Sequence, residues 1–217
     1  MTEHGDGLSL EEAAARHGAY LWVERRLFEL TGAWTGVPGI AAAARIHLFE
    51  ASARHAWHAE LWRERLPLVA GFDVEAIVRP WSAELDAALG AIAPPHTAGA
   101  HEPDELALMG ALCTGILPRL VRSYRAYLDR ASETSDAPGM RVAALVVRDE
   151  EEEIDAGSAV LRELGTDRAH RAHTGPSGGA DARGTGAGSA ARPVAGSPAR
   201  PAARLADWPP WTGILPA

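Results

Sequence analysis

His55 and His58 are the residues of this chain best placed to do chemistry. They lie one helical turn apart in the segment Arg54-His55-Ala56-Trp57-His58, inside an apolar helical pattern. Side chains at positions i and i+3 project from the same face of a helix, so both imidazoles point in one direction. Imidazole is a common ligand of transition metals. The pair therefore predicts half of a metal site.

Acidic residues in two other helical patterns supply the matching half. Glu150 and Glu153 belong to the acidic run 149–153 and interrupt an apolar stripe at core-facing positions, and Glu24 also has apolar neighbours on its helix face. A carboxylate is costly to bury unless it meets a cation, a hydrogen-bond donor or a metal ion. The predicted metal ligands are Glu24, His55, His58, Glu150 and Glu153.

The same residues also fit a site without metal. Arg54 and Arg148 stand beside the two pairs and offer counter-charge, which would make the group a buried ion-pair network. The two histidines also fit a role at the edge of the core, bonded to carboxylates or backbone. Because the acidic residues are consecutive, some of them must face solvent, and Glu151 and Glu152 are expected on the surface. The sequence leaves these interpretations open.

Four long helical patterns must position these residues. The first begins at Ser9, whose hydroxyl can cap the helix with Glu12 as its capping-box partner. Proline or glycine marks the ends of the patterns, and Pro118 predicts a kink inside the third. The expected helices span residues 9–30, 40–66, 103–130 and 140–164.

The connections predict how these helices are arranged. Links of about seven residues join the first helix to the second and the third to the fourth, and such short links favour antiparallel hairpins. The middle link, 67–102, is long enough to cross the bundle and carries a short helical pattern around Trp81–Ile92. We therefore expect an all-α four-helix bundle with a long crossover between the second and third helices. An up-and-down bundle with an extra helix is the alternative.

Residues 9–164 resemble the ferritin-like di-iron carboxylate superfamily in this architecture and in short motifs. In that family two helices each give one Glu and two others each give a Glu-x-x-His pair. Glu24 matches a lone carboxylate, while His55-x-x-His58 and Glu150-x-x-Glu153 occupy the places of the two pairs. Both pairs differ from the family's motif, and the third helix has no central acid; its inward-facing candidates are Cys113 and Tyr124.

The resemblance implies a non-haem iron or manganese centre and, for an enzyme, oxygen-dependent oxidation. Arg54, Tyr124 and Arg148 would surround the ligands. Iron storage is disfavoured because the full set of paired ligands is missing. The alternative is a non-enzymatic helical protein that has lost the di-iron centre and acts as an interaction module. The sequence does not decide whether the protein is an enzyme.

Composition limits the other functions. All 21 basic residues are arginine, and residues 1–164 hold 15 of them against 26 acids, a net charge of −11. That charge disfavours nucleic-acid partners, including the substrates of ferritin-like tRNA-modifying hydroxylases, although Arg119, Arg122 and Arg125 form a local basic patch. A single cysteine, with neither a signal-peptide pattern nor a membrane-spanning run, predicts a cytoplasmic protein without a membrane partner.

The two ends of the chain are expected to be flexible. Residues 1–8 precede the first helix cap, and residues 165–217 are so rich in Gly, Ala and Pro that a disordered tail is predicted. The tail ends in a Trp-Pro-Pro-Trp segment, where Trp208 and Trp211 could dock on this domain or on a protein partner. Trp22, Trp57 and Trp62 are expected to contribute to packing and to a homodimer surface.

Overall fold

The structure, a computed structural model, describes residues 8–68, 73–94 and 104–174. As predicted, the fold is all-α: the described residues contain helices and connections but no strand. Residues 1–7 and 175–217, with Trp208 and Trp211, lie outside the described residues. The elements are α1 (Leu10–Thr35), α2 (Ala42–Arg63), α3 (Val74–Ile77), α4 (Ala83–Ala91), α5 (Glu105–Gly110), the π-helical η1 (Ala111–Ile116), α6 (Leu117–Arg130) and α7 (Glu133–Thr174).

Helix α1 begins where the sequence predicted and ends later. Ser9 caps it, accepting from the Glu12 amide at 3.2 Å, and the Glu12 carboxylate accepts from the Ser9 amide at 2.8 Å. The predicted stop at Thr31-Gly32 is wrong, because the helix continues to Thr35. A Cβ on Gly32 would come within 2.9 Å of the Ser52 hydroxyl. Gly32 therefore serves the close approach of α1 and α2, and it does not end the helix.

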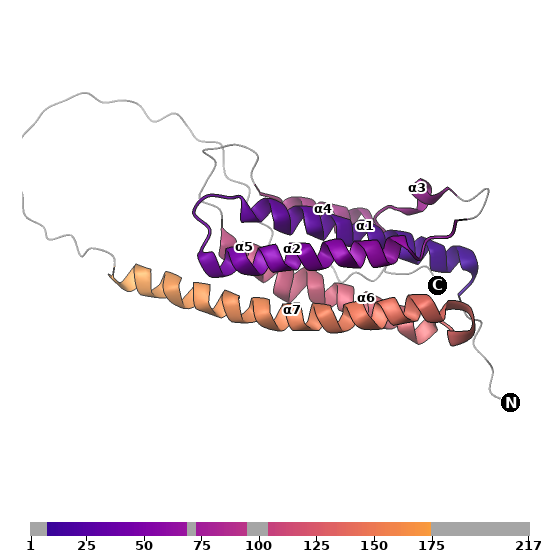
Figure 1. The fold of residues 1–217 in the computed structure, drawn as a ribbon. Coiled ribbons are helices and arrows are strands. Elements are labelled where there is room, and N and C mark those ends of the chain that lie inside the picture. Colours follow the sequence, from indigo (N-terminus) through magenta and orange to yellow (C-terminus); the bar gives the residue numbers. More distant parts are fainter. Residues whose placement is uncertain (1–7, 69–72, 95–103, 175–217) are drawn as a thin grey trace, which may run out of the picture.

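The long helices form two antiparallel hairpins, α1 with α2 and α6 with α7 (Figure 1). The N-terminal part of α1 also lies beside the C-terminal end of α6, where Nε2 of His17 is 3.1 Å from the Tyr127 hydroxyl. Helices α2 and α6 are both antiparallel to α1 and hence parallel to each other. The connection between the hairpins carries α3 and α4, which pack on α1, and α4 coincides with the short helix predicted around residues 81–92.

The third long segment is one helical rod made of α5, η1 and α6. Its irregularity lies just before Pro118, near the predicted kink, where six residues adopt the wider π-helical turn. Proline has no N–H to donate, and its ring displaces the carbonyl four residues earlier. By length and hydropathy Glu105–Arg130 could also cross a membrane. However, 61% of its most apolar window is buried, which is typical of a core helix.

Helix α7 is longer at both ends than predicted. It starts at Glu133, with one non-helical residue at Asp136 (φ −140°, ψ 30°), and it runs through Gly165 to Thr174. Asp136 accepts from the Gly139 amide, so it acts as an internal cap at the point where the sequence suggested a start. Gly165 has open space around it, and nothing there forces the helix to stop. The first ten residues of the predicted tail are therefore helical.

Large aromatic side chains fill the core beside the two histidines. Trp62 and Tyr124 are parallel, with ring centroids 5.7 Å apart, and Tyr20 lies 4.3 Å from Tyr124. All three are fully buried or nearly so. This packing fixes α1, α2 and α6 around the level of the bundle at which Glu24, His55 and His58 lie.

Candidate metal centre

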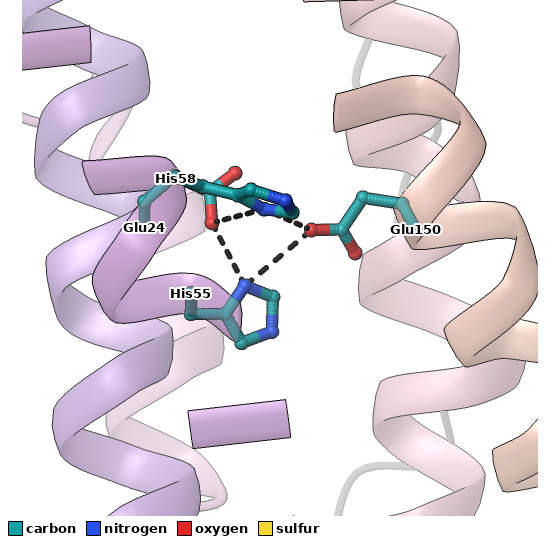
Figure 2. A group of neighbouring side chains, drawn as sticks. All are labelled: Glu24, His55, His58 and Glu150. Carbon is teal, nitrogen blue, oxygen red and sulfur yellow. Dashed lines mark hydrogen bonds and ion pairs between the residues drawn. The ribbon is translucent and has the colours of Figure 1, made fainter. Parts of the chain in front are cut away.

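Four of the predicted ligands meet in the interior of the bundle (Figure 2). Glu24 comes from α1, His55 and His58 from α2, and Glu150 from α7, and one ligand atom of each lies within 4.8 Å of the others. All four side chains are fully buried. Residues 126 positions apart in the chain thus converge on one point.

The four atoms form a closed ring in which imidazole and carboxylate alternate. Nδ1 of His55 is 2.8 Å from Oε2 of Glu24 and 3.4 Å from Oε1 of Glu150. Nδ1 of His58 is 3.6 and 3.4 Å from the same two oxygens. A cation about 2.1 Å from four tetrahedral donors places those donors roughly 3.4 Å apart. The ring therefore has the dimensions of a metal-ligand set.

Several polar atoms of this group lack a hydrogen-bond partner among the described residues. They are Nδ1 of His58, Nε2 of His55 and both carboxylate oxygens of Glu150. Buried polar groups are nearly always satisfied, because an unsatisfied one costs about 1–3 kcal/mol. His58 Nδ1 and Glu150 Oε1 both belong to the ring. A cation inside it would satisfy these two atoms together.

Local helical geometry explains why these side chains face inward. On α2 the two histidines continue a buried stripe of Leu48, Ala51 and Trp62. On α7 Glu150 follows the buried Ala143 and Val146 at the spacing of one helix face. Since α1 and α2 are antiparallel, Glu24 lies level with the histidine pair.

Tyr124 of α6 supports the carboxylate of Glu24 with a hydrogen bond. Its hydroxyl donates a hydrogen bond to Oε1 of Glu24, the oxygen that does not take part in the ring. The prediction that Tyr124 surrounds the ligands fits this position. Cys113, the other inward-facing candidate on that segment, is also buried but does not belong to the group.

Two further carboxylates on α7 contact the outer nitrogens of the imidazoles. Oδ2 of Asp149 is 3.3 Å from Nε2 of His58, and Oε1 of Glu153 is 3.4 Å from Nε2 of His55. An acceptor on one ring nitrogen holds the proton there and leaves the other nitrogen free to bind a metal. In His58 the nitrogen left free in this way is Nδ1, which faces the centre. In His55 the hydrogen bond is made by Nδ1, to Glu24 at 2.8 Å, and Nε2 lies 3.4 Å from Glu153 without a hydrogen bond.

Arginines hold these outer carboxylates in place. Nη1 of Arg54 is 3.1 Å from Oε2 of Glu153, and Nη2 of Arg148 is 3.2 Å from Oδ1 of Asp149. Glu153, predicted as a ligand, thus lies outside the group of four and next to His55. Arg54 and Arg148 lie one step further out, each paired with a carboxylate that contacts an imidazole.

The electrostatics of the metal-free site are those of charged imidazoles among carboxylates. Burial disfavours both imidazolium ions, but the surrounding carboxylates outweigh it, raising the pKa of His58 to about 10 and that of His55 well above its usual value. Burial also opposes the charge of Glu24, yet the two histidines lower its pKa to about 2. Burial and the charge of Glu24 raise the pKa of Glu150 to about 7.

These pKa shifts determine which protons a bound metal ion would displace from the site. Without metal, two imidazolium ions face Glu24 and Glu150, while Arg54 balances Glu153. A divalent cation that binds the neutral imidazoles displaces two protons and brings two positive charges. The total charge of the buried site is then unchanged by the exchange when Glu150 is ionised, and a protonated Glu150 would lose its proton as well.

Asp149 contacts an imidazole of the site, a role that was not predicted from the sequence. It lies immediately before Glu150, and the acidic run around it suggested a solvated surface. Its side chain is only 13% exposed because it turns toward His58. A usable signal is its position beside Glu150, since a residue next to a ligand is well placed to reach the edge of the same site.

Comparisons with protein-family models, with curated proteins and with solved structures find no match to this chain. The functional assignment therefore rests on the chemistry of the buried group.

Proposed function

We propose that this protein binds one divalent transition-metal ion through Glu24, His55, His58 and Glu150. The observation that carries the proposal is the closed ring of two imidazole nitrogens and two carboxylate oxygens, with edges of 2.8 to 3.6 Å, in a fully buried site. The ring includes atoms of His58 and Glu150 that have no hydrogen-bond partner among the described residues.

The donor set fits iron or manganese, the ions that the ferritin-like resemblance implies. Carboxylate oxygen suits hard cations and imidazole nitrogen suits borderline ones, whereas the thiolate that would select Cu(I) or a zinc-thiolate site is missing from the group. A bound iron or manganese ion would supply one-electron redox chemistry and the activation of dioxygen. The chain's own residues would bind and orient the ion and exclude water, with Tyr124 donating its hydroxyl proton to Glu24 and Asp149 accepting from Nε2 of His58.

We propose further that the bundle is a ferritin-like fold with an atypical centre for one ion, acting in oxygen-dependent oxidation. The parallel direction of α2 and α6, and the long connection with α3 and α4, support this topology. The absence of an acid on the third helix within the group supports a single ion, since a second ion would need further carboxylates.

Metal analysis of the full chain tests the proposal. Protein from cells grown with added iron or manganese should contain about one ion per chain. Replacing both histidines, His55→Ala with His58→Ala, should remove it, whereas the surface pair Glu151→Gln with Glu152→Gln should not. Circular dichroism verifies that each variant is folded, and Glu150→Gln is a milder second variant. Metal content that survives the loss of both histidines would overturn the proposal.

A second candidate function is a structural one, in which the group is an ion-pair network inside a non-enzymatic helical protein. The contact of 2.8 Å between Glu24 and His55, and the Arg54–Glu153 pair, favour it because they already neutralise charge without metal. In that case added Mn(II) or Fe(II) leaves the melting temperature unchanged. A metal site instead raises stability, by about 2.7 kcal/mol when the ion is at 100 times its dissociation constant.

Oxygen consumption separates metal binding from catalysis. The Fe(II)-loaded protein should consume dioxygen faster than the variant that lacks both histidines, at equal total iron. Equal rates would leave a metal-binding protein without the proposed oxidation.

A further inference from the structure

The outward face of α2 carries an apolar stripe that the metal centre does not use. Ile46, Phe49 and Trp57 are 60%, 66% and 48% exposed, and the exposed Ala53 lies between the two aromatic residues. The spacing of three, four and four residues places all of them on one side of the helix. His55 and His58 are on the opposite side. Exposed apolar patches of this kind mark interaction sites.

The neighbouring helix extends this patch. Phe28 of α1 is 43% exposed, and its carbonyl accepts a hydrogen bond from Ser52 of α2 at 3.0 Å. The patch therefore spans the α1–α2 hairpin. Helix α2 makes its main contacts with α1 and α7, which lie on its other sides.

We propose that a second copy of this chain covers the stripe, with the two α2 helices antiparallel about a two-fold axis at Ala53. Phe49 and Trp57 lie four residues on either side of Ala53, and Ile46 and Glu60 lie seven residues on either side. A two-fold axis at Ala53 therefore places Phe49 of each copy opposite Trp57 of the other. A two-fold interface requires this kind of self-complementary patch.

Charge complementarity supports the same arrangement. Arg45 and Glu60 lie on the same side of the stripe, and the two-fold axis brings Arg45 of each copy next to Glu60 of the other. Within its own chain Glu60 accepts from Arg63 at 2.8 Å, so Arg45 of the other copy would be a second cation beside this carboxylate. Within the chain, the Arg45 guanidinium donates only to the carbonyls of Val37 and Ile40, at 3.3 and 3.4 Å. It thus has no carboxylate partner among the described contacts of its own chain. The small side chain of Ala53 permits close approach of the helices where they cross.

The mass of the 217-residue chain in solution tests this pairing. Light scattering and sedimentation at micromolar concentration should give twice the chain mass of 22.9 kDa. Ala53→Glu should halve that mass, whereas Ala144→Glu, at an exposed alanine of α7, should not change it. A monomeric native protein, or an Ala53→Glu variant that stays dimeric, would overturn the proposal. Binding of the stripe to another partner or to residues 175–217 would give the first of these outcomes.

Charge reversal and cross-linking test the register. Arg45→Glu should weaken the dimer, and the double change Arg45→Glu with Glu60→Arg should restore it. Ala53→Cys should cross-link on oxidation while Ala144→Cys should not, and the native Cys113 is buried. Failure of both the rescue and the cross-link would overturn the antiparallel register. The Ala53→Glu variant should keep its metal, because the stripe and the ligands lie on opposite sides of α2. The dimer proposal and the metal-site proposal are therefore tested independently.

Discussion

Tyr124 on α6 and Glu24 on α1 are joined by a hydrogen bond that leaves the two oxygens of the Glu24 carboxylate with different partners. The phenol donates to Oε1, while Oε2 faces the two imidazoles. The bond thereby turns Oε2 toward the centre of the ring. It also connects α6, which provides no ligand, to the site.

Removing this hydroxyl should weaken both the fold and the metal site. Tyr124→Phe leaves a buried carboxylate oxygen without its donor, at a cost of about 1–3 kcal/mol. Tyr20→Phe is the matched control, because Tyr20 is equally buried and donates to the Ser123 carbonyl at 3.0 Å, away from the ligands. Both variants should melt at lower temperature, but only Tyr124→Phe should lower the affinity for Mn(II). Equal affinities in the two variants would contradict a role for Tyr124 at the site.

The metal-free protein should lose stability as the pH rises. The fold raises the pKa of His58 from 6.5 to about 10, so its contribution is complete below pH 6.5 and disappears as the pH passes 10. Glu150 acts in the same direction, because its pKa is raised from 4.5 to about 7 and its ionisation inside the fold is opposed. Thermal melts with a chelator should show the melting temperature falling between pH 6 and 9, a range inside these pKa limits.

Metal binding should oppose this dependence of stability on pH. Protons compete with the ion for both imidazoles, so affinity and the stabilisation that follows from it increase with pH. The difference in melting temperature between metal-loaded and metal-free protein should therefore widen from pH 6 to 9. A constant difference would argue against coordination by the histidines.

Metal uptake should release between two and three protons near neutral pH, one from each imidazolium and a fraction from Glu150, whose pKa is about 7. Calorimetric titration of Mn(II) in two buffers that differ in ionisation enthalpy measures this number. His58→Gln should reduce it by about one. Binding without proton release would place the ion elsewhere on the chain.

Asp149 should tune the affinity without being a ligand. Asp149→Asn weakens the acceptor that holds the His58 proton on Nε2, and the loss of such an outer contact typically costs 10–100-fold in metal affinity. Asp155→Asn, an exposed change on the same helix, is the control and should have no effect. An Asp149→Asn variant with unchanged affinity would show that the 3.3 Å contact does not orient the imidazole.

Two glycines of α7 should respond in opposite ways to alanine. A Cβ on Gly157 would lie 2.3 Å from Sγ of Cys113 and 2.9 Å from Nε2 of His47, whereas Gly165 has nothing within 4 Å. Gly157→Ala should therefore destabilise the fold by forcing the helices apart. Gly165→Ala should stabilise it by up to about 1 kcal/mol through helix propensity. Urea denaturation of the two variants measures both effects, and a stabilised Gly157→Ala variant would contradict the packing around that residue.

The sequence predicted those parts of the site that depend on local periodicity. His55 and His58 share a face because they are three residues apart, and Glu150 is buried because it continues an apolar stripe. Their convergence with Glu24 was a hypothesis based on chain order and link length. Asp149 and Glu153 could not be assigned in this way, because whether a carboxylate binds an ion or an imidazole depends on distances between helices.

The helix ends were the least predictable part of the fold. Gly32 and Gly165 both look like stop signals, yet α1 and α7 continue through them. In the first case the glycine is explained by contact with Ser52 on another helix. Gly165 has no comparable contact. Helix α7 continues through it because packing along most of the helix outweighs one residue of low helix propensity.

The ring of carboxylates and imidazoles gives the protein two ways to complete its interior. Protons on the imidazoles and the proposed divalent ion would neutralise the same carboxylates, so the fold would not need the ion to complete its interior. Such a chain would stay folded while metal is scarce and take the ion up later without refolding. Its metal content would then follow the supply in its surroundings, whereas its folded state would not depend on that supply.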